Sequence, residues 1–482
     1  MASQNERVSQ KDQNVALLIN GESLQSETRL PVLNPVDHSE VWTYSCATVQ
    51  DAFQAVEAAQ AAFPAWASTN PVRRSEILRK AADMMLERMG ELATYMKLET
   101  GSSDQFIEFN ITTTASQLRD VANRAPSIQG SFPSVENDGR SALVLKEPYG
   151  VVVGIAPWNA PYILGTRAVS AALAAGNTLV LKGSEASPRC YHAIIDILHA
   201  AGLPNGCLNL IFSSQENAAE VTETLIKHPA VGKINFTGSA AIGRLVAATA
   251  GKHLKPVLLE LGGKASAIVF DDADLKKAAT FCLLGAFLNS GQVCMGTERI
   301  LVQSSIASAF AQQLGETLRE MRQSPDMAPQ LISRKAEDRF RALMSDALGQ
   351  GAIPIEDGVG DRPKDVISPT VLKNVHRGMD IFYAESFGPV ATLHTFETEQ
   401  DATDLANDTE FGLAGAIFTE SLGRGLRVAR KYTTGAVHIN SMSIHDEASL
   451  PHGGVKSSGF GRFNSDQGLD EFLRTKIITW EN

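Results

Sequence analysis

The sequence predicts an α/β protein whose first sheet is parallel and doubly wound. After Gly150, short β-branched runs alternate with helix-like segments, and the runs fall at 151–157, 178–182, 208–212 and 231–236. Apolar strands separated by crossover helices are typical of a parallel sheet covered on both faces, which binds ligands at the carboxyl ends of its strands. A second series of runs predicts a second α/β region between about residues 260 and 445, with strands at 267–270, 299–302, 414–418 and 436–440.

Length and composition agree with a multidomain globular protein. At a prior of about 150 residues per domain, 482 residues predict two or three domains. The net charge of −11 argues against nucleic acid or an anionic membrane as a partner. The five cysteines form no CxxC pair, so we expect no disulfide framework and no metal site. Residues 1–15 carry charges of both signs, unlike a secretory signal, and a cytoplasmic location is expected.

Two long uncharged runs, 149–166 and 278–297, have the length of membrane spans but not their chemistry. The first contains Pro157, Asn159 and Pro161, and the second is interrupted by the polar sequence NSGQ. Neither run can satisfy its backbone as one helix in lipid, so no membrane association is expected.

The front of the chain is expected to be mainly helical. Thr48 followed three residues later by Asp51 indicates a helix start, and small apolar residues at helical spacing predict a helix over 47–66. A second helical stretch over 71–100 starts at a proline suited to a first turn and is expected to break near Gly90.

Two segments are expected to pair away from both cores. They are the polar insert 129–145 and the C-terminal segment 465–482, which contains the run LRTKIITW. Exposed strand edges of this kind commonly pair with another subunit. We therefore expect these segments to bridge the subunits of a homodimer or homotetramer.

Two strand ends carry residue types that suit a nucleotide. The strand ending at Thr237 runs into a turn with Gly238, Ser239 and Gly243, where a helix N-terminus can hold a phosphate. The plain alternative is a strand-to-helix turn with no ligand. Another strand ends at Lys182 and is followed by Glu185. This pair can bind a ribose diol, with a solvated ion pair as the alternative; the carboxylate would repel a 2′-phosphate.

Three residues have the chemistry of a catalytic site. Glu260 lies in an apolar strand before two glycines, and burial is expected to raise its pKa and make it a general base. Cys294 follows a Gly-containing loop that can present a nucleophile, and Asn159 stands between two prolines that can hold its amide as an oxyanion donor. The alternatives are a structural glutamate, an inert cysteine and a turn-forming asparagine.

In this order, the segments resemble the aldehyde dehydrogenase superfamily over essentially the whole chain from about residue 17. The matching motifs are PWN at 157–159, KxxE at 182–185, FTGSxxxG at 236–243, LELGGK at 259–264, GQxC at 291–294, ESFGPV at 385–390, FGLAG at 411–415 and PHGGVKSSGFGR at 451–462. The resemblance implies a Rossmann-type doubly wound NAD-binding domain, a catalytic α/β domain and a β oligomerisation arm. The implied NAD-binding domain comprises 1–128 and 146–259, and the catalytic domain comprises 260–445. The oligomerisation arm comprises 129–145 and 465–482.

The resemblance also implies the reaction and the roles of its residues. Cys294 would attack an aldehyde as thiolate, Asn159 would hold the oxyanion, and Glu260 would activate the water that hydrolyses the thioester to the acid. Glu385 would bind the nicotinamide ribose and Phe387 would pack beside the nicotinamide. The remaining implied NAD contacts are Ile155, Trp158, Lys182, Glu185, Gly238, Ser239, Gly243 and Leu261.

Several details look like the salicylaldehyde and vanillin dehydrogenase branch, namely Arg167, the run CMGTER at 294–299 and HDE at 445–447. Many members place a lysine where this chain has Ala168. Arg167 would then bind an oxygen substituent of the substrate or pair with an acidic residue such as Glu471. The expected substrate is an aromatic aldehyde, and its contacts are Tyr162, Arg167, Val293, Met295, Ile444 and His452.

Two other functions remain open at this stage. One is a broad-specificity aliphatic aldehyde dehydrogenase, and the other is a thiol hydrolase or acyltransferase that uses Cys294. The second lacks a recognisable His and Asn partner motif for the cysteine. A non-catalytic relative is disfavoured because Cys294, Glu260 and Asn159 are all present.

Overall fold

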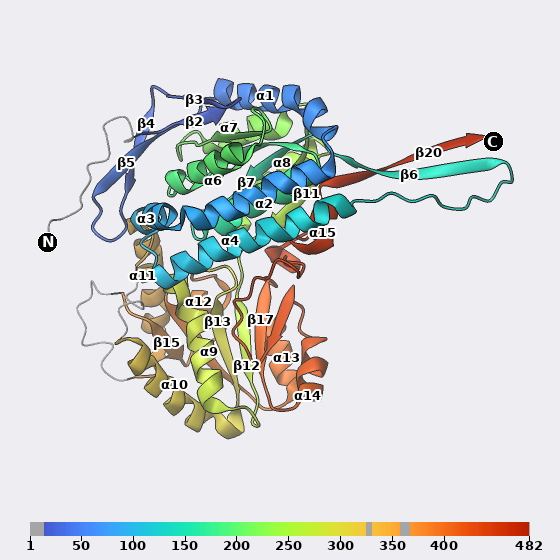
Figure 1. Cartoon of the computed structure of the whole chain (residues 1–482). Helices are drawn as coiled ribbons and strands as arrows, with labels where there is room; N and C mark the ends of the chain where they lie inside the picture. The colour runs from blue at the N-terminus through green and yellow to red at the C-terminus, as the bar shows by residue number, and fades with distance from the viewer. Residues whose placement is uncertain (1–13, 324–329, 357–366, 482) are drawn as a thin grey trace.

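The computed structural model describes residues 14–323, 330–356 and 367–481. Two large sheets, each covered by helices, lie one above the other, and a long two-stranded arm projects to one side (Figure 1). The predicted α/β class is therefore confirmed. Residues 1–13, which belong to the stretch that predicts no secretory signal, lie outside the described residues.

The first sheet contains the predicted parallel core. Within the described ranges its strand order is β19-β11-β10-β7-β8-β9-β2-β3. Five neighbouring strands are parallel, and β19, β2 and β3 add antiparallel edges. The bounds are β2 Leu17–Ile19, β3 Glu22–Leu24, β7 Val151–Ile155, β8 Thr178–Lys182, β9 Leu208–Ile211, β10 Val231–Thr237, β11 Val257–Glu260 and β19 Gly459–Phe460.

Helices cover both faces of this sheet. α1, α7 and α8 pack on one face and α5 and α6 on the other, where α2 and α4 form a further layer. Their bounds, with α3, are α1 Val49–Ala67, α2 Pro71–Glu87, α3 Met89–Thr100, α4 Asp104–Arg124, α5 Pro161–Ala174, α6 Pro188–Ala201, α7 Ala218–Lys227 and α8 Ala240–Lys252. The Thr48 and Asp51 capping box is confirmed, while the break expected near Gly90 falls at Arg88.

The second sheet has the order β14-β15-β16-β13-β12-β17-β18 in the described part of the chain. Its strands are β12 Ala265–Val269, β13 Thr297–Gln303, β14 Ile353–Pro354, β15 Thr370–Lys373, β16 Val390–Phe396, β17 Ala414–Phe418 and β18 Ala436–Ile439. Apolar residues of α9 and α10 fill one face, and those of α13 and α14 fill the other. Its helices are α9 Leu275–Phe287, α10 Ala307–Met321, α11 Arg334–Gly349, α12 Asp380–Tyr383, α13 Glu399–Asn407 and α14 Leu422–Ala429.

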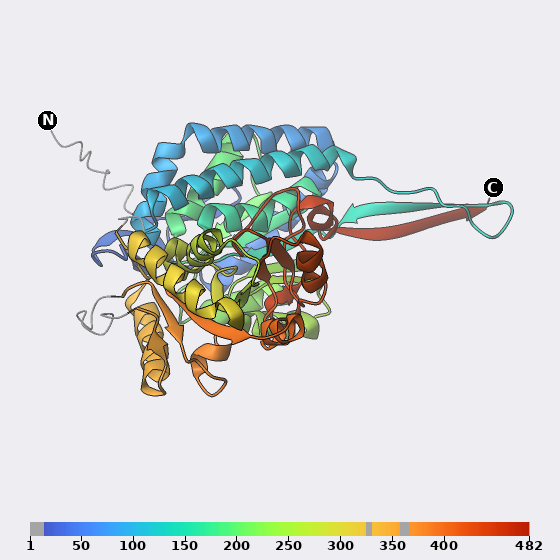
Figure 2. The ribbon, with the colours of Figure 1, turned by 90° about the horizontal axis from the view of Figure 1, so that it is seen from below.

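The arm pairs β6 (Arg140–Pro148) with β20 (Leu473–Glu481) in antiparallel register, from Arg140 opposite Glu481 to Pro148 opposite Leu473. Both views show it extending well beyond the helices (Figure 2). The short helix α15 (Ser465–Asp470) leads into it. Within the two predicted segments, 140–145 and 473–481 pair with each other away from both cores as expected, whereas α15 and Phe472 pack into the first core.

A small sheet was not predicted from the sequence. It pairs β1 (Asn14–Val15) and β4 (Arg29–Leu33) with β5 (Glu40–Ser45), so the front of the chain is less helical than expected. Its strands are only two to six residues long, and the apolar run of β4 contains Pro31, a residue that argues against a strand. In the described ranges, no helix combines the length and the apolar character needed to cross a membrane.

Candidate active site

Most of the predicted catalytic and cofactor residues converge on one cavity. Its walls come from the segments that follow β7 and β10, the end of β11, the loop before β13 and the start of α11. The predicted residues that line it are Trp158, Asn159, Gly238, Ser239, Glu260, Leu261, Cys294, Glu385 and Phe387. The cavity thus lies at the carboxyl ends of the first sheet, where a doubly wound sheet binds its ligand.

The loop that carries Cys294 has an unusual backbone. After α9, the residues Asn289, Ser290 and Gly291 all have positive φ angles, of 50°, 59° and 73°. A Cβ atom at Gly291 would lie 2.2 Å from the Gly388 carbonyl oxygen, so only glycine fits there. The half-exposed Cys294 follows, and no hydrogen bond within the described ranges uses its backbone N–H. That N–H is therefore free to stabilise an oxyanion.

Asn159 is held against this loop by its side chain and by its backbone carbonyl. Its side-chain Nδ2 donates to the Gln292 carbonyl at 3.0 Å, and its own carbonyl accepts from Asn289 Nδ2 at 3.2 Å. The side chain is 5% exposed. Because one amide hydrogen is used by Gln292, the other is left for a second acceptor near Cys294.

Glu260 ends β11 at the floor of the cavity and is fully buried. Neither of its carboxylate oxygens has a hydrogen-bond partner among the described residues, and His452 Nε2 lies 3.9 Å from Oε1. A buried carboxylate without partners is rare in proteins, which favours a role in binding a water molecule or a proton.

The sign of the Glu260 pKa corrects the sequence prediction. Burial alone would raise the pKa, as predicted, but His452, Arg167 and the Cys294 thiol outweigh burial and lower it. For Cys294, burial and the Glu260 carboxylate raise the pKa well above the ordinary value of a thiol. At neutral pH the arrangement is therefore a neutral thiol beside an ionised carboxylate that can accept its proton.

Three of the predicted aldehyde contacts pack in one apolar cluster with Cys294, next to the cavity but not among the residues that line it. They are Val293, Met295 and Ile444. Tyr162 does not join them, because its fully buried side chain donates to the Leu92 carbonyl at 2.7 Å and does not line the cavity. The predicted contact of Tyr162 with the aldehyde is therefore corrected to a role in the core.

Arg167 lies beneath the site in a buried ion pair with Asp446. The sequence left two roles for Arg167, binding a substrate oxygen or pairing with an acidic residue, and the structure shows the second. The predicted partner Glu471 is wrong, because Glu471 pairs with Lys233 at 2.6 Å. Asn464 donates to the other Asp446 oxygen at 2.9 Å. The Asp446 carboxylate thus has partners on both oxygens, and the guanidinium is held away from solvent.

The cofactor side of the cavity fits a nicotinamide dinucleotide. Ser239 caps the N-terminus of α8, whose free N–H groups face the cavity beside Gly238. At Gly262, in the loop between β11 and β12, a Cβ atom would lie 2.4 Å from the Glu385 carboxylate, so glycine is needed for that carboxylate to approach the loop. The rings of Trp158 and Phe387 meet edge to face with centroids 5.8 Å apart.

Other predicted cofactor residues extend the site toward an adenosine. Glu185 lines a second cavity that shares Ile332 and Ser333 with the first, so the two cavities are adjacent. Lys182 ends β8 and its ammonium group has no hydrogen-bond partner among the described residues; burial lowers its pKa. Ile155 ends β7 and is 8% exposed. Leu261 packs directly against Gly243, where a Cβ atom would lie 2.5 Å from Leu261 Cδ2.

The side of the catalytic cavity formed by α11 was not predicted from the sequence. Lys335 and Arg339 line the cavity, and Arg339 donates to the Glu385 carbonyl at 2.6 Å. Burial, followed by the nearby Glu298, raises the pKa of the Glu385 carboxyl to about 7. Neither α11 residue lies in a recognisable motif, and basic residues on one helix face are usually solvated, so only the fold reveals them.

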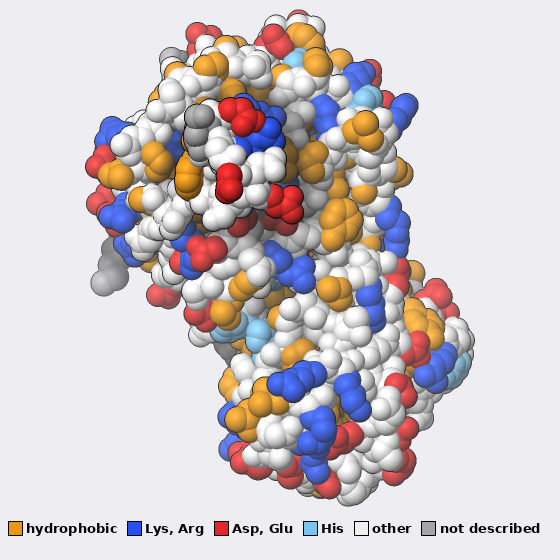
Figure 3. All heavy atoms as spheres, turned by 90° about the vertical axis from the view of Figure 1, so that its right-hand side faces the viewer, with side chains coloured by type: hydrophobic (Ala, Val, Ile, Leu, Met, Phe, Trp, Pro, Cys, Tyr) orange, Lys and Arg blue, Asp and Glu red, His pale blue; other side chains and the backbone are white. Residues whose placement is uncertain are grey.

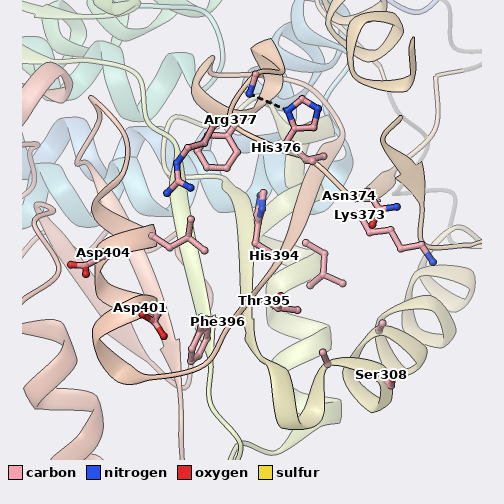
Figure 4. Close-up of a pocket in the computed structure, with 17 residues that line it drawn as sticks. Ser308, Lys373, Asn374, His376, Arg377, His394, Thr395, Phe396, Asp401 and Asp404 are labelled. Atoms are coloured by element: carbon pink, nitrogen blue, oxygen red, sulfur yellow. Dashed lines mark hydrogen bonds between the residues drawn. The ribbon is translucent and has the colours of Figure 1, made fainter. Parts of the chain in front are cut away.

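A second groove lies on the catalytic sheet, at the ends of β15 and β16 between α10 and α13 (Figure 4). We call it the far groove; its polar lining residues are Ser308, Lys373, Asn374, His376, Arg377, His394, Thr395, Asp401 and Asp404. It shares no lining residue with the catalytic cavity and contains none of the predicted site residues.

Comparisons with known proteins agree with this geometry. The profile of the Aldehyde dehydrogenase family matches residues 22–478. A vanillin dehydrogenase from Pseudomonas fluorescens is 42% identical over 475 residues, covering 97% of this chain and 98% of its own length. The crystal structure of a salicylaldehyde dehydrogenase from Pseudomonas putida G7, complexed with salicylaldehyde, has a TM-score of 0.94 at 34% identity and covers 97% of this chain and 98% of that one.

Two further solved structures differ in cofactor. A betaine aldehyde dehydrogenase from Staphylococcus aureus in complex with NAD⁺ has a TM-score of 0.91 at 32% identity, covering 98% of this chain and 96% of that one. An NADP dependent enzyme from E. coli has a TM-score of 0.92 at 34% identity, covering 97% of this chain and 98% of that one. Proteins with this fold therefore use either nicotinamide dinucleotide.

Proposed function

This chain belongs to the aldehyde dehydrogenase family, and on that premise we propose that it oxidises aromatic aldehydes to carboxylic acids with NAD. The observation that carries the proposal is the meeting of Cys294, Glu260 and Asn159 in one cavity. Each brings an unused group to it: a thiol, a carboxylate without hydrogen bonds, and an amide hydrogen beside a free backbone N–H.

In the first half-reaction Cys294 is the nucleophile. Its sulfur adds to the aldehyde carbon as the thiol loses its proton to the Glu260 carboxylate, which lines the same cavity. The carbonyl oxygen becomes an oxyanion held by the Asn159 amide and the Cys294 N–H. A nicotinamide dinucleotide held by Glu385 and Phe387 would supply the acceptor for the hydride of the thiohemiacetal carbon, and Cys294 would then carry a thioester.

In the second half-reaction Glu260 is the general base. Once the proton taken from the thiol has passed to solvent, Glu260 takes a proton from a water molecule whose oxygen attacks the thioester carbon, and the same two donors hold the new oxyanion. The carbon–sulfur bond then breaks, the acid leaves, and Cys294 departs as thiolate. The ionised state of Glu260, which His452 and Arg167 favour, is the state this step needs.

Carboxylates at the adenosine end support NAD over NADP. Glu185 lines the second cavity together with Glu99 and Glu216. A 2′-phosphate there would meet negative charge, whereas a ribose diol would find acceptors and the Lys182 ammonium. Equal kcat/KM values with NAD and NADP would contradict this assignment.

The apolar cluster at the thiol supports an aromatic substrate. Val293, Met295 and Ile444 offer a surface without charge, which suits a flat ring. A panel of benzaldehyde, salicylaldehyde and vanillin against hexanal and succinic semialdehyde tests this, with reduced nicotinamide absorbance as the readout. We expect the highest kcat/KM among the aromatic aldehydes; a preference for aliphatic ones would favour the broad-specificity alternative. Turnover without nicotinamide reduction would instead favour a thiol hydrolase.

The arm supports assembly into a homodimer or homotetramer. Ile477, Ile478 and Trp480 on β20 are 67%, 42% and 39% exposed, and an isolated two-stranded ribbon is marginal in water. Viewed along the arm, hydrophobic side chains lie among charged ones on this face (Figure 3). Light scattering should show an oligomer; a monomer that remains fully active would contradict the bridging role of 129–145 and 465–482.

The remaining assignments follow from the same premise. Residues 1–128 and 146–259 form the NAD-binding domain, and 260–445 form the catalytic domain. All five cysteines are unpaired thiols, which supports a reducing compartment such as the cytoplasm.

A further inference from the structure

A buried ion pair links the two segments that carry the proposed base and nucleophile. Lys264 follows Glu260 by four residues, and Glu298 follows Cys294 by four residues. Their side chains are 1% and 9% exposed and form an ion pair. The pair stands where β12 and β13 begin side by side, next to Ala265 opposite Thr297.

Both members of the pair also hold the turn that bears Glu385 and Phe387. Ser386 N–H donates to the two Glu298 carboxylate oxygens at 2.9 and 3.0 Å, and Phe387 N–H donates to Oε1 at 3.3 Å. On the other side, Lys264 Nζ donates to the Ala384 carbonyl at 2.7 Å. The pair therefore binds the backbone before and after Glu385.

This turn has a backbone that needs such support. Phe387 has a φ of 45°, a left-handed conformation that is costly for a bulky residue and persists only where its surroundings impose it. The Glu385 side chain is held in addition by Gly263 N–H, which donates to Oε1 at 3.0 Å. The positions of the ribose-binding carboxylate and the ring beside the nicotinamide thus depend on the strand of Glu260 and on the strand after Cys294.

We propose that Glu298, paired with Lys264, is a positioning residue. It holds the turn that bears Glu385 and Phe387 in a fixed position relative to the nucleophile Cys294 and the base Glu260. A carboxylate can accept two backbone N–H groups and an ammonium at once, whereas an apolar residue accepts none. Glu298 touches neither the aldehyde nor the reacting atoms and acts through Glu385 and Phe387. This inference rests on the proposed function for its kinetic readout but not for its binding readout.

A purely structural pair makes a different prediction. Replacing a buried ion pair by neutral residues of similar volume is often harmless to stability. If Lys264 and Glu298 only join two strands, neutral replacements that keep the volume should behave alike. If Glu298 positions the turn, the replacement must also keep an acceptor for Ser386 and Phe387.

Two double variants separate these cases. Lys264→Met with Glu298→Gln removes both charges and keeps an acceptor, whereas Lys264→Met with Glu298→Met removes both charges and the acceptor at nearly the same volume. We expect Tm values within a few degrees of each other and unchanged alkylation of Cys294 by iodoacetamide. We expect NADH to bind the Met/Met protein at least about tenfold more weakly, as measured by fluorescence titration.

Kinetics with benzaldehyde provide the second readout. In the Met/Met protein kcat should fall and the kinetic isotope effect with formyl-deuterated benzaldehyde should rise, because a displaced turn slows hydride transfer. Equal NADH affinity and equal isotope effects in the two double variants would overturn the proposal. If the Met/Met protein does not fold, Glu298→Asp takes its place, since it keeps the charge but withdraws the carboxylate from the turn.

The wild-type protein distinguishes failure of this inference from failure of the proposed function. Wild type that binds NADH but reduces NAD with no aldehyde would contradict the proposed function and leave the affinity comparison valid. Active wild type with indistinguishable double variants would contradict only the role of Glu298.

Discussion

The catalytic cavity and the far groove are both hollows at the ends of parallel strands, yet their polar groups are arranged in opposite ways. In the far groove several charged groups are exposed and also have local partners: Arg377 pairs with Asp408 at 2.7 Å, and Asp401 accepts from Thr398 N–H at 2.9 Å. In Figure 4 His376 likewise accepts a hydrogen bond from its own loop, from Gly378 N–H at 3.1 Å.

In the catalytic cavity, buried polar groups remain without partners. Both Glu260 oxygens, His452 Nε2 and the Cys294 N–H have none among the described residues. Such groups cost stability unless a ligand or water meets them. The difference teaches that a cavity is best identified as a site when several segments bring buried groups without hydrogen-bond partners to it.

The largest expected effect is that of Cys294→Ala, which removes the nucleophile. NAD reduction with benzaldehyde should fall by more than about 10⁴-fold, because no other group can form the thioester. NADH affinity should stay within about twofold, which shows that the site is intact. Activity close to that of the wild type would contradict the assignment of Cys294 as the nucleophile.

Asn159→Ala should have the next largest effect, because it removes one oxyanion donor. Loss of a single donor costs about 10²–10³-fold in kcat in comparable sites. Asn159→Asp is the matched control: it keeps the size, loses the donor and should be at least as slow. A change in KM alone would show that Asn159 binds substrate without stabilising the transition state.

The Glu385 carboxyl should make cofactor binding depend on pH near neutrality. Its pKa is raised to about 7, first by burial and then by Glu298. Only the ionised form can accept hydrogen bonds from both ribose hydroxyls, so NADH affinity should increase as the pH rises from 6 to 8. In Glu385→Gln the affinity should be weaker and nearly constant over this range. A wild-type affinity that falls with rising pH would contradict this role.

The smallest effect is expected in the far groove. Lys373→Ala and Asp404→Ala remove exposed charges there and should change kcat/KM by less than about twofold and the free energy of unfolding by less than about 0.5 kcal/mol. A tenfold loss of activity in either variant would mean that the far groove takes part in the reaction, and the comparison would no longer hold.

The sequence predicts the parts of the molecule that depend on local pattern. The strands at 178–182 and 414–418 have the predicted bounds, because continuous apolar runs between turn residues define a buried strand. Order and spacing of short motifs indicate Glu260, Cys294 and Asn159, because each motif places one residue at a strand end or in a tight loop.

Contacts between distant segments could not be predicted. The partner of Arg167 lies 279 positions away at Asp446, and the contact of Lys264 with Glu298 becomes visible only when β12 and β13 lie side by side. The predicted rise of the Glu260 pKa is wrong for the same reason, since His452 and Arg167 approach the carboxylate from other elements and lower its pKa.

The central claim is that Cys294 carries the acyl group and Glu260 removes it. Mass spectrometry of Glu260→Gln, mixed with benzaldehyde and NAD and quenched in acid, tests it directly. Acylation should also slow, because Glu260 accepts the thiol proton, but solvent can take that proton in its place. Hydrolysis should slow more, because the attacking water then has no base, so the benzoyl thioester should accumulate on the peptide that contains Cys294 as about one nicotinamide per active site is reduced. Steady turnover at the wild-type rate without an adduct, or an adduct on another cysteine, would contradict the account.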